Sequence, residues 1–410
     1  MMINTYALIW GQNSPMPEQS ITPTYDVENA VLSRYQAGAQ THEPSLCCPT
    51  EYQDIHYLDV IPDEILTKDY GCGDPTRYAI PGDTVLDLGC GAGKNCYMVA
   101  QKVGPTGKVI GVDFNDVMLN LARKYQGAIA TKIGFQNTEF VKGKIQDLKL
   151  PLEPLQAWLQ ANPIITLEDI ARYEIEGDRL RATSPLIADE SIDLVISNCV
   201  LNLVKPRDKQ QLFQEIHRVL KKGGRAVISD IVCDEPPTEK ILNDPELWSG
   251  CIAGAFLEAE FLQMFEAAGF SSVEILNYGA EPWQTIDGIE FRSMTVRAYK
   301  GEKAIGRERH QAVIYKGPWK QIQDDAGRTY FRGERMAVCD QTFQRLTNPD
   351  GPYAGQFIPV APYQAIPLET AAPFNCHPEA RRDPQETKGA DYQLTQLTED
   401  AACCRTDSCC

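Results

Sequence analysis

The chain has 410 residues, of which 43% are hydrophobic, and its formal net charge is −17. This length is enough for two or three domains with hydrophobic cores. The acidic balance argues against nucleic acid and anionic membranes as partners, because both would repel the chain; a small neutral or cationic substrate fits better. The apolar stretch at residues 6–10 is too short for a signal peptide and follows no basic region, so we expect a cytoplasmic protein.

Residues 1–82 are predicted to form an N-terminal arm that carries cysteines. A short helix is expected early in this arm. Cys47 and Cys48 stand side by side before a proline, which places them in a turn. Two glycines bracket Cys72 within residues 69–75, so this cysteine is expected in a loop.

The centre of the chain begins with an apolar strand that enters a glycine turn, Val85-Leu86-Asp87-Leu88-Gly89-Cys90-Gly91-Ala92-Gly93-Lys94. Its three glycines remove Cβ atoms where the backbone must turn sharply and approach a ligand, and the following helix offers unpaired N–H groups. A dinucleotide fingerprint has its third glycine, or an alanine, where this chain has Lys94. Asp87 lies just inside the turn, where its charge would repel a pyrophosphate but attract an ammonium group.

A second acid, Asp113, ends the next strand at the distance expected of a carboxylate that accepts both ribose hydroxyls. An adenosine ligand with a cationic end and no pyrophosphate is S-adenosylmethionine. Strand, turn and second acid resemble those of class I methyltransferases. The cofactor residues implied in this way are Tyr70, Asp87, Gly89, Gly91, Gly93, Asp113, Asn115, Ile145, Gln146 and Asn198. Tyr70 would face the sulfonium, since aromatic faces attract cations, although packing explains it equally well.

Residues 83–302 are predicted to form an α/β, Rossmann-like methyltransferase core, with a substrate region at residues 236–270. The strands expected late in this core are Ile192–Ser197, Arg225–Ile231, Ser272–Leu276 and Phe291–Tyr299, of which the last two would close the sheet as an antiparallel pair, as in class I methyltransferases. The interval 149–190 is unusually long and contains a capping box at Thr166-Leu167-Glu168-Asp169, which indicates two helices in a solvated insertion.

Beyond the core, residues 303–347 are predicted to form a small β-rich C-terminal domain. From residue 348 to 410 the chain is rich in proline and polar residues, so we expect a flexible tail. This tail ends with the pairs Cys403-Cys404 and Cys409-Cys410, which could capture metal or metalloid but could equally have no role.

The chain has 14 cysteines, which in a large protein without a signal peptide are more typical of reduced thiols, ligands or redox pairs than of disulfides. Cys199 follows a core strand directly, at the edge where open α/β sheets bind ligands. Cys72 and Cys251 lie in loops that could fold over the same place. With no CxxC pair among them and no histidine or carboxylate expected nearby, three such thiolates suit a soft, three-coordinate guest.

Several other candidate residues are better explained by packing. Cys90, Cys96 and Cys233 sit inside predicted core elements, where cysteine behaves as a small hydrophobe. His217 lies among core-facing positions of a predicted helix and is a poor catalytic candidate.

At the three spaced cysteines the sequence resembles the arsenite methyltransferases. The matching segments are Cys47-Cys48, Tyr70-Gly71-Cys72-Gly73, Ser197–Val204, Trp248–Ala255, Tyr315–Trp319 and Ala337–Asp340. The likeness runs from about residue 26 to residue 345 and departs at the interval 149–190. Two adjacent cysteines stand where one redox partner is expected, so either Cys47 or Cys48 could act.

The resemblance implies that arsenite, or thiol-bound As(III), is held as a trithiolate by Cys72, Cys199 and Cys251. Three sulfurs leave arsenic a lone pair directed at the methyl group of S-adenosylmethionine, and holding both in line supplies proximity. No general base is needed, because this nucleophile carries no proton. A disulfide of Cys47 or Cys48 with Cys72 would return methylated arsenic to the trivalent state, and thioredoxin or glutathione would reset the enzyme. The expected role is arsenic detoxification by a monomer.

Three alternatives remain open from the sequence. A methyltransferase acting on a small organic nucleophile would need a general base near the cofactor, and no histidine is an obvious candidate. A non-catalytic metalloid trap would use the same thiols without the cofactor. Antimony or selenium could replace arsenic, since either would use the same residues.

Overall fold

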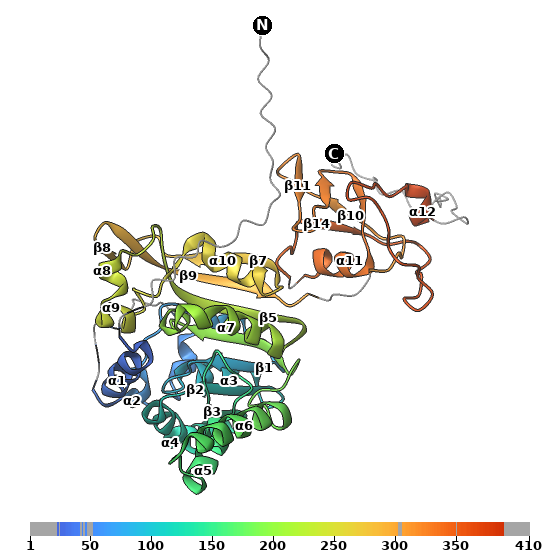
Figure 1. Cartoon of the computed structure of the whole chain (residues 1–410). Helices are drawn as coiled ribbons and strands as arrows, with labels where there is room; N and C mark the ends of the chain where they lie inside the picture. The colour runs from blue at the N-terminus through green and yellow to red at the C-terminus, as the bar shows by residue number, and fades with distance from the viewer. Residues whose placement is uncertain are drawn as a thin grey trace. The chain divides into compact units, whose positions relative to one another are not determined.

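The computed structural model describes residues 23, 25–41, 43, 46, 52–301, 306–349 and 351–388 of the chain. The chain divides into two compact units, Met1–Gly301 and Glu302–Cys410, which are coloured blue to yellow and orange to red in Figure 1. Cys47 and Cys48, the expected redox pair, and the terminal cysteine pairs lie outside the described residues.

The first unit is built on a nine-stranded sheet whose main path has the order β3-β2-β1-β4-β5-β9-β7. These strands are β3 (Thr138–Lys142), β2 (Lys108–Asp113), β1 (Thr84–Leu88), β4 (Ile192–Asn198), β5 (Leu220–Cys233), β9 (Ile289–Tyr299) and β7 (Ser271–Tyr278), with the short β6 (Phe256–Leu257) beside β5 and β8 (Gln284–Ile286) beside β9. β1 runs parallel to β2 and β4, whereas β9 is antiparallel to β5 and β7. The predicted α/β sheet with an antiparallel last pair is therefore confirmed.

Helices pack on this sheet through two separate hydrophobic clusters. The helices of the unit outside the 149–190 interval are α1 (Val27–Gln40), α2 (Asp63–Leu66), α3 (Lys94–Val103), α4 (Asp116–Ile133), α7 (Pro206–Val219), α8 (Glu239–Leu242), α9 (Pro245–Ser249) and α10 (Glu258–Ala267), with 3₁₀ turns η2 (Ile55–Leu58), η3 (Pro75–Tyr78) and η4 (Leu201–Leu203). Because side chains alternate along a strand, Val85 of β1 joins the cluster of α3 and α4, whereas Leu86 and Leu88 join that of α7 and α10. In the described part of the chain, no helix is long and apolar enough to cross a membrane.

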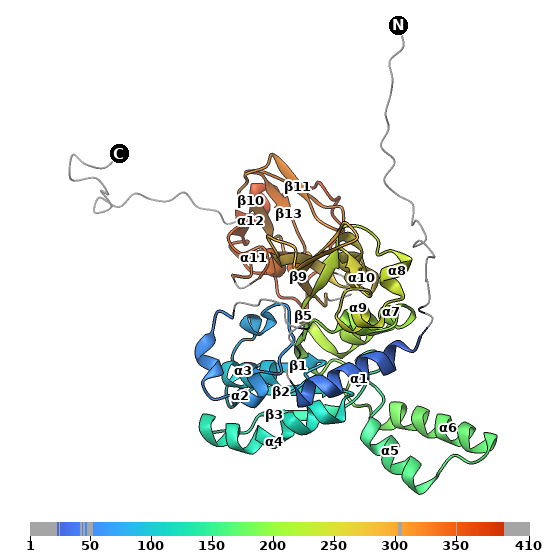
Figure 2. The same ribbon diagram turned by 90° about the vertical axis from the view of Figure 1, so that its left-hand side faces the viewer.

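The interval 149–190 forms the predicted pair of helices, α5 (Leu152–Ala161) and α6 (Leu167–Thr183). Thr166 and Asp169 form the capping box that the sequence indicated, with the Asp169 carboxylate accepting the Thr166 N–H at 2.8 Å. Figure 2 shows the two helices projecting beyond β3 and α4. Both are largely solvent-exposed, which agrees with an insertion.

The second unit has a three-stranded sheet of order β13-β10-β14 and a separate hairpin of β11 and β12. Its elements are β10 (Ala312–Tyr315), β11 (Gln321–Gln323), β12 (Thr329–Phe331), β13 (Arg335–Ala337), α11 (Asp340–Thr347), β14 (Phe357–Val360) and α12 (Pro384–Lys388). The sequence interpretation ended this domain at residue 347 and expected a flexible tail from 348, whereas β14 pairs with β10 along its length. The buried Phe357 anchors this proline-rich segment, since its ring packs 5.2 Å from that of Tyr330.

Candidate active site

One cavity of the first unit opens at the carboxyl ends of the parallel strands, where ligands bind in open α/β sheets. Eight of the ten predicted cofactor residues line it, namely Tyr70, Gly89, Gly91, Asp113, Asn115, Ile145, Gln146 and Asn198. Cys199 lines the same cavity. The cofactor candidates and one candidate substrate thiol therefore meet in a single space.

The carboxylate of the second acid, Asp113, accepts hydrogen bonds from the glycine turn and from the start of α4. Gly91 donates its N–H to Oδ2 of Asp113 at 2.9 Å, and Asn115 donates its N–H to Oδ1 at 2.8 Å. Burial raises the pKa of the Asp113 carboxyl. Gly89 has a φ of 68°, and a Cβ at this position would lie 2.4 Å from the Val200 side chain. The turn thus depends on glycine both for its backbone conformation and for its close approach to the segment that follows β4.

Two buried amide atoms of the cavity have no hydrogen-bond partner within the described residues. They are Oδ1 of Asn95, in the first turn of α3, and Nδ2 of Asn115, the N-cap of α4. Buried polar atoms are normally hydrogen-bonded, so an unused acceptor and donor in a ligand cavity indicate a polar ligand. S-adenosylmethionine offers both donors and acceptors, and these residues fit it. Asn95 was not predicted, although its position directly after the turn marks it.

Two predicted cofactor residues do not line the cavity. Asp87 lies on the same face of β1 as Val85, beneath α3, where Oδ2 accepts a hydrogen bond from the Cys96 thiol at 3.2 Å. Burial, only partly opposed by this hydrogen bond, raises the pKa of Asp87 to about 7. Gly93 is the N-cap of α3 with a φ of 87°, and a Cβ there would lie 2.9 Å from the Phe140 ring. Strand alternation and helix packing therefore explain these two positions.

Tyr70 joins the cavity to helix α1. Its hydroxyl donates to the Gly38 carbonyl at 3.0 Å and accepts the Glu43 N–H at 3.1 Å. Its ring meets that of Tyr35 edge to face, with centroids 6.0 Å apart. Both tyrosines line the cavity, so packing and cation attraction are compatible roles for Tyr70.

The three candidate thiols are buried together at the end of the sheet. Cys72, Cys199 and Cys251 are 3%, 4% and 3% exposed and belong to one apolar cluster with Trp248. The Cys251 thiol lies 3.0 Å from the carbonyl oxygen of Cys199. Cys72 lies 127 residues before Cys199 in the chain and Cys251 lies 52 residues after it, so distant segments converge at this cluster.

Asn198 connects the loop of Cys72 to the strand that precedes Cys199. Its side-chain oxygen accepts the N–H groups of Cys72 at 2.8 Å and Gly73 at 3.0 Å, and its amide group donates to the Gly73 carbonyl at 2.8 Å. A Cβ at Gly71 would lie 2.3 Å from this amide group. Asn198 therefore both lines the cavity and positions Cys72.

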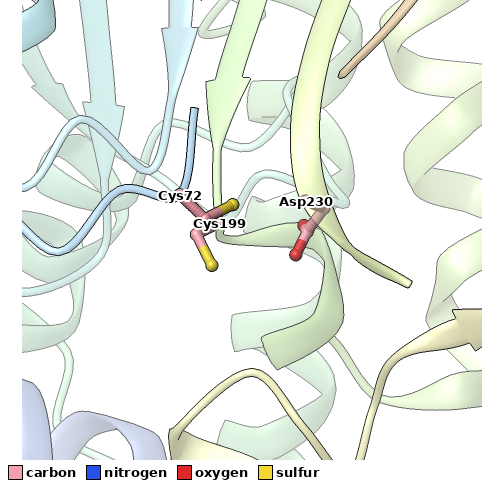
Figure 3. Close-up of side chains that lie close together, drawn as sticks. All are labelled: Cys72, Cys199 and Asp230. Atoms are coloured by element: carbon pink, nitrogen blue, oxygen red, sulfur yellow. The ribbon is translucent and has the colours of Figure 1, made fainter. Parts of the chain in front are cut away.

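A buried carboxylate, Asp230, lies beside two of these thiols. Figure 3 shows it with Cys72 and Cys199, and the ligand atoms of the three side chains all lie within 4.8 Å of one another. Burial raises the pKa of Asp230 to about 6. The expectation that no carboxylate is near the thiols was wrong. The sequence did carry a signal, because Asp230 stands at the carboxyl end of a predicted strand beside the strand that leads to Cys199.

The backbone is strained at two of the thiols. Cys199 and Cys251 have φ values of 63° and 64°, a conformation that non-glycine residues rarely adopt. Side chains hold the surrounding loops in place: Asp230 accepts the Leu201 N–H at 2.8 Å, and Asn202 donates to the Cys251 carbonyl at 3.1 Å. Strain that is maintained in this way is common at functional sites.

Tyr35 and Lys209 border the thiol cluster. Burial, reinforced by Cys251 and Cys199, raises the pKa of the Tyr35 hydroxyl well above its usual value. Lys209 is buried, donates to the Gly254 carbonyl at 2.6 Å, and lies 3.7 Å from the centre of the Phe256 ring. Burial lowers the pKa of Lys209 to about 8, against the opposing charges of Glu260 and Asp230. Sequence reasoning singled out neither residue.

The residues assigned to packing are found in packed surroundings. Cys90, Cys96 and Cys233 are buried free thiols. The His217 ring packs edge to face on Phe270, with centroids 5.1 Å apart. No histidine is among the residues that line the cavity in the described part of the chain.

Comparison with known proteins agrees with this geometry. A family model described as a methyltransferase domain matches residues 80–171 and 174–269, and one described as a domain of unknown function (DUF8838) matches residues 302–392. An arsenite methyltransferase of Mus musculus is 31% identical over 302 residues, which cover 71% of each chain. The chain belongs to the arsenite methyltransferase family. Another arsenite methyltransferase, from Halobacterium salinarum, is 38% identical over 207 residues, but the match spans only 42% of that relative.

A solved structure of the arsenite methyltransferase family has the same fold. It is an arsenic(III) S-adenosylmethionine methyltransferase from Chlamydomonas reinhardtii, 26% identical, with a TM-score of 0.52. The match covers 80% of this chain and all of that one. The sequence prediction of an S-adenosylmethionine-dependent methyltransferase of this family is thus confirmed.

Proposed function

We propose that this chain transfers a methyl group from S-adenosylmethionine to As(III) held by Cys72, Cys199 and Cys251, and so detoxifies arsenite. The observation that carries the proposal is that Cys199 lines the same cavity as the glycine turn, while the other two thiols are buried in one apolar cluster with Cys199. A methyl donor bound at the turn would therefore share one space with a metalloid bound at Cys199. Membership in the arsenite methyltransferase family supports the choice of metalloid.

Each part of the cavity has a separate task in this reaction. S-adenosylmethionine supplies an electrophilic methyl group on a sulfonium. Asp113 would accept the ribose hydroxyls, Asn95 and Asn115 would pair with polar atoms of the cofactor, and apolar walls would exclude water. The thiols would hold arsenic with its lone pair directed at the methyl group, so no proton has to be removed from the nucleophile. Proximity and alignment are the main source of rate.

Return of arsenic to the trivalent state would require two electrons from thiols. In this step Cys47 or Cys48 loses its proton and attacks the Cys72 sulfur: one sulfur–sulfur bond forms, the arsenic–sulfur bond of Cys72 breaks, and its electron pair returns arsenic to the trivalent state on the two remaining thiolates. Thioredoxin or glutathione would then reduce this disulfide by thiol exchange. A reducing compartment such as the cytoplasm suits thiols that must be returned to the reduced form after each cycle, and every step described here needs only one copy of the chain.

The test is an assay of the purified chain with arsenite, S-adenosylmethionine and a dithiol reductant. We expect methylated arsenic from the wild type and a loss of roughly 100-fold or more in Cys199→Ser and Cys251→Ser, because a missing thiolate misplaces the acceptor. Cys233→Ser is the matched control, since its thiol is buried in the same apolar cluster but lies outside the proposed ligand set. Full activity in the first two variants, or no methylated arsenic from the wild type, would overturn the proposal.

A further inference from the structure

The thiol cluster contains a second set of ligand atoms that differs from the three cysteines. Sγ of Cys72, Sγ of Cys199 and a carboxylate oxygen of Asp230 all lie within 4.8 Å of one another, and the three residues are 3%, 4% and 0% exposed (Figure 3). They come from the loop before η3, the end of β4 and the adjacent β5. Among the described residues, Cys251 is not part of this set.

Asp230 has hydrogen-bonding capacity left for a ligand. Oδ2 accepts the N–H groups of Leu201 at 2.8 Å and Asn202 at 3.3 Å, and Oδ1 accepts that of Ile231 at 2.9 Å. A carboxylate offers about four lone-pair sites, so about one remains unused by these three contacts. The backbone contacts also fix the orientation of the carboxylate, as hydrogen bonds do for ligands in metal sites.

The chemistry of this set differs from what As(III) requires. Arsenic is held by sulfur in the proposed function, whereas two thiolates and a carboxylate suit a borderline divalent cation such as Zn²⁺. Ligands of a tetrahedral zinc ion lie about 3.5 to 4 Å apart, given bonds of about 2.0 to 2.3 Å, so small side-chain rotations would close the present spacing. The buried Lys209 would offset part of the negative charge of the three ligands.

We propose that Cys72, Cys199 and Asp230 form a zinc site within the substrate region, and that Zn²⁺ bound there excludes As(III). Two thiols lose their protons to solvent when the ion binds, the carboxylate becomes the third ligand, and no electrons move. Because the two guests share Cys72 and Cys199, they compete. The exclusion of arsenite rests on the proposed function, but the zinc site itself does not.

The test measures both guests on the same full-length proteins, reduced with a phosphine that contains no thiol. Cys403, Cys404, Cys409 and Cys410 are replaced by serine in every protein, so that zinc bound to these residues is not counted. Zinc affinity is measured by competition with a chromogenic chelator. Arsenite affinity is measured from the quenching of Trp248 fluorescence, since Trp248 packs in the thiol cluster. The Trp248→Phe variant identifies the part of the signal that comes from this residue.

Two variants should separate the two sites. Asp230→Asn should lower zinc affinity at least about tenfold more than it lowers arsenite affinity, because only zinc uses the carboxylate. Cys251→Ser should do the reverse and weaken arsenite while leaving zinc affinity within about threefold of the wild type. Asp234→Asn, four residues along the chain and exposed, is the matched control and should change neither. In the wild type, zinc should raise the apparent dissociation constant for arsenite in proportion to its concentration.

The outcomes distinguish the two proposals. Equal loss of zinc affinity in Cys251→Ser and Cys72→Ser would mean that the ion uses the three thiols, and this inference would be wrong even if Asp230→Asn did not fold. Unchanged zinc affinity in a folded Asp230→Asn would also overturn it. Zinc binding with the expected pattern but without arsenite binding would leave the zinc site standing and contradict the proposed function.

Discussion

The two halves of the active site are built in opposite ways. The cofactor half comes mostly from one continuous stretch, in which β1, the glycine turn, β2 and the cap of α4 follow one another between residues 84 and 115. The thiol half comes from separate segments that include Cys72, Cys199, Asp230 and Cys251. Local backbone rules shape the first half, whereas long-range hydrogen bonds assemble the second. A substitution in the cofactor half should therefore affect mainly its own surroundings, whereas one in the thiol half should also displace segments that are distant in the chain.

Asn198 should give the largest effect, because it belongs to both halves. Asn198→Ala removes three hydrogen bonds to the Cys72 loop and leaves buried backbone groups unpaired. We expect arsenite affinity, measured by the Trp248 signal, to fall by roughly 100-fold, equivalent to about 3 kcal/mol. Asn137→Ala is the control, since Asn137 also donates two hydrogen bonds to backbone carbonyls but lies outside the site. Similar losses in both variants would mean that the effect is general destabilisation.

Asp87 tests the cofactor half through pH. Its pKa is raised from 3.8 to about 7 by burial, so the stability that its protonated form contributes is complete below pH 3.8 and is lost as pH rises through 7. Asp87→Asn removes this loss. The free energy of unfolding, measured with urea, should therefore fall by about 2–3 kcal/mol more in the wild type than in the variant when the pH is raised from 5 to 8. The same difference at both pH values would contradict the assignment.

Substitution of Asp113 should have a smaller effect, which is confined to the cofactor half. Asp113→Asn keeps one acceptor oxygen but loses the charge, so S-adenosylmethionine affinity should fall about tenfold, or about 1.4 kcal/mol, by calorimetry. Arsenite affinity without the cofactor should stay within about twofold, because the Asp113 carboxylate is hydrogen-bonded to Gly91 and Asn115 in the cofactor half. Asp116→Asn is the control for loss of charge, because Asp116 is exposed in the first turn of α4, does not line the cavity and pairs with Lys142 at 2.7 Å.

The glycines of the turn should give the smallest effect. Gly91 and Gly93 both have positive φ, but a Cβ on Gly91 meets no atom within 4 Å, whereas one on Gly93 lies 2.9 Å from Phe140. Gly93→Ala should therefore lower the free energy of unfolding by about 1 kcal/mol more than Gly91→Ala, in addition to the cost of a left-handed residue common to both. Equal losses would assign the role of Gly93 to backbone conformation alone.

The sequence was most informative where neighbours in the chain are neighbours in space. The positions of the strands along the chain, the turn, Asp113 and the Asn115 cap follow from local pattern. The sequence was less informative where a residue's surroundings depend on how elements pack. The alternation of β1 places Asp87 against Cys96 of α3, and its role toward the cofactor stays a prediction. The segment after residue 348 looked too polar to fold, but Phe357 and the pairing with β10 give it a core and a sheet to join.

The sequence by itself determined the fold class, the cofactor turn and the three spaced cysteines, because helices, strands and turns have local sequence signals. Only the tertiary structure decided which groups share one site. It brought Asp230 next to Cys72 and Cys199 and held the backbone of Cys199 and Cys251 in a strained conformation. The physical reason is that contacts between distant segments depend on how strands pair and loops fold back. No local sequence pattern specifies which side chains these long-range contacts bring together.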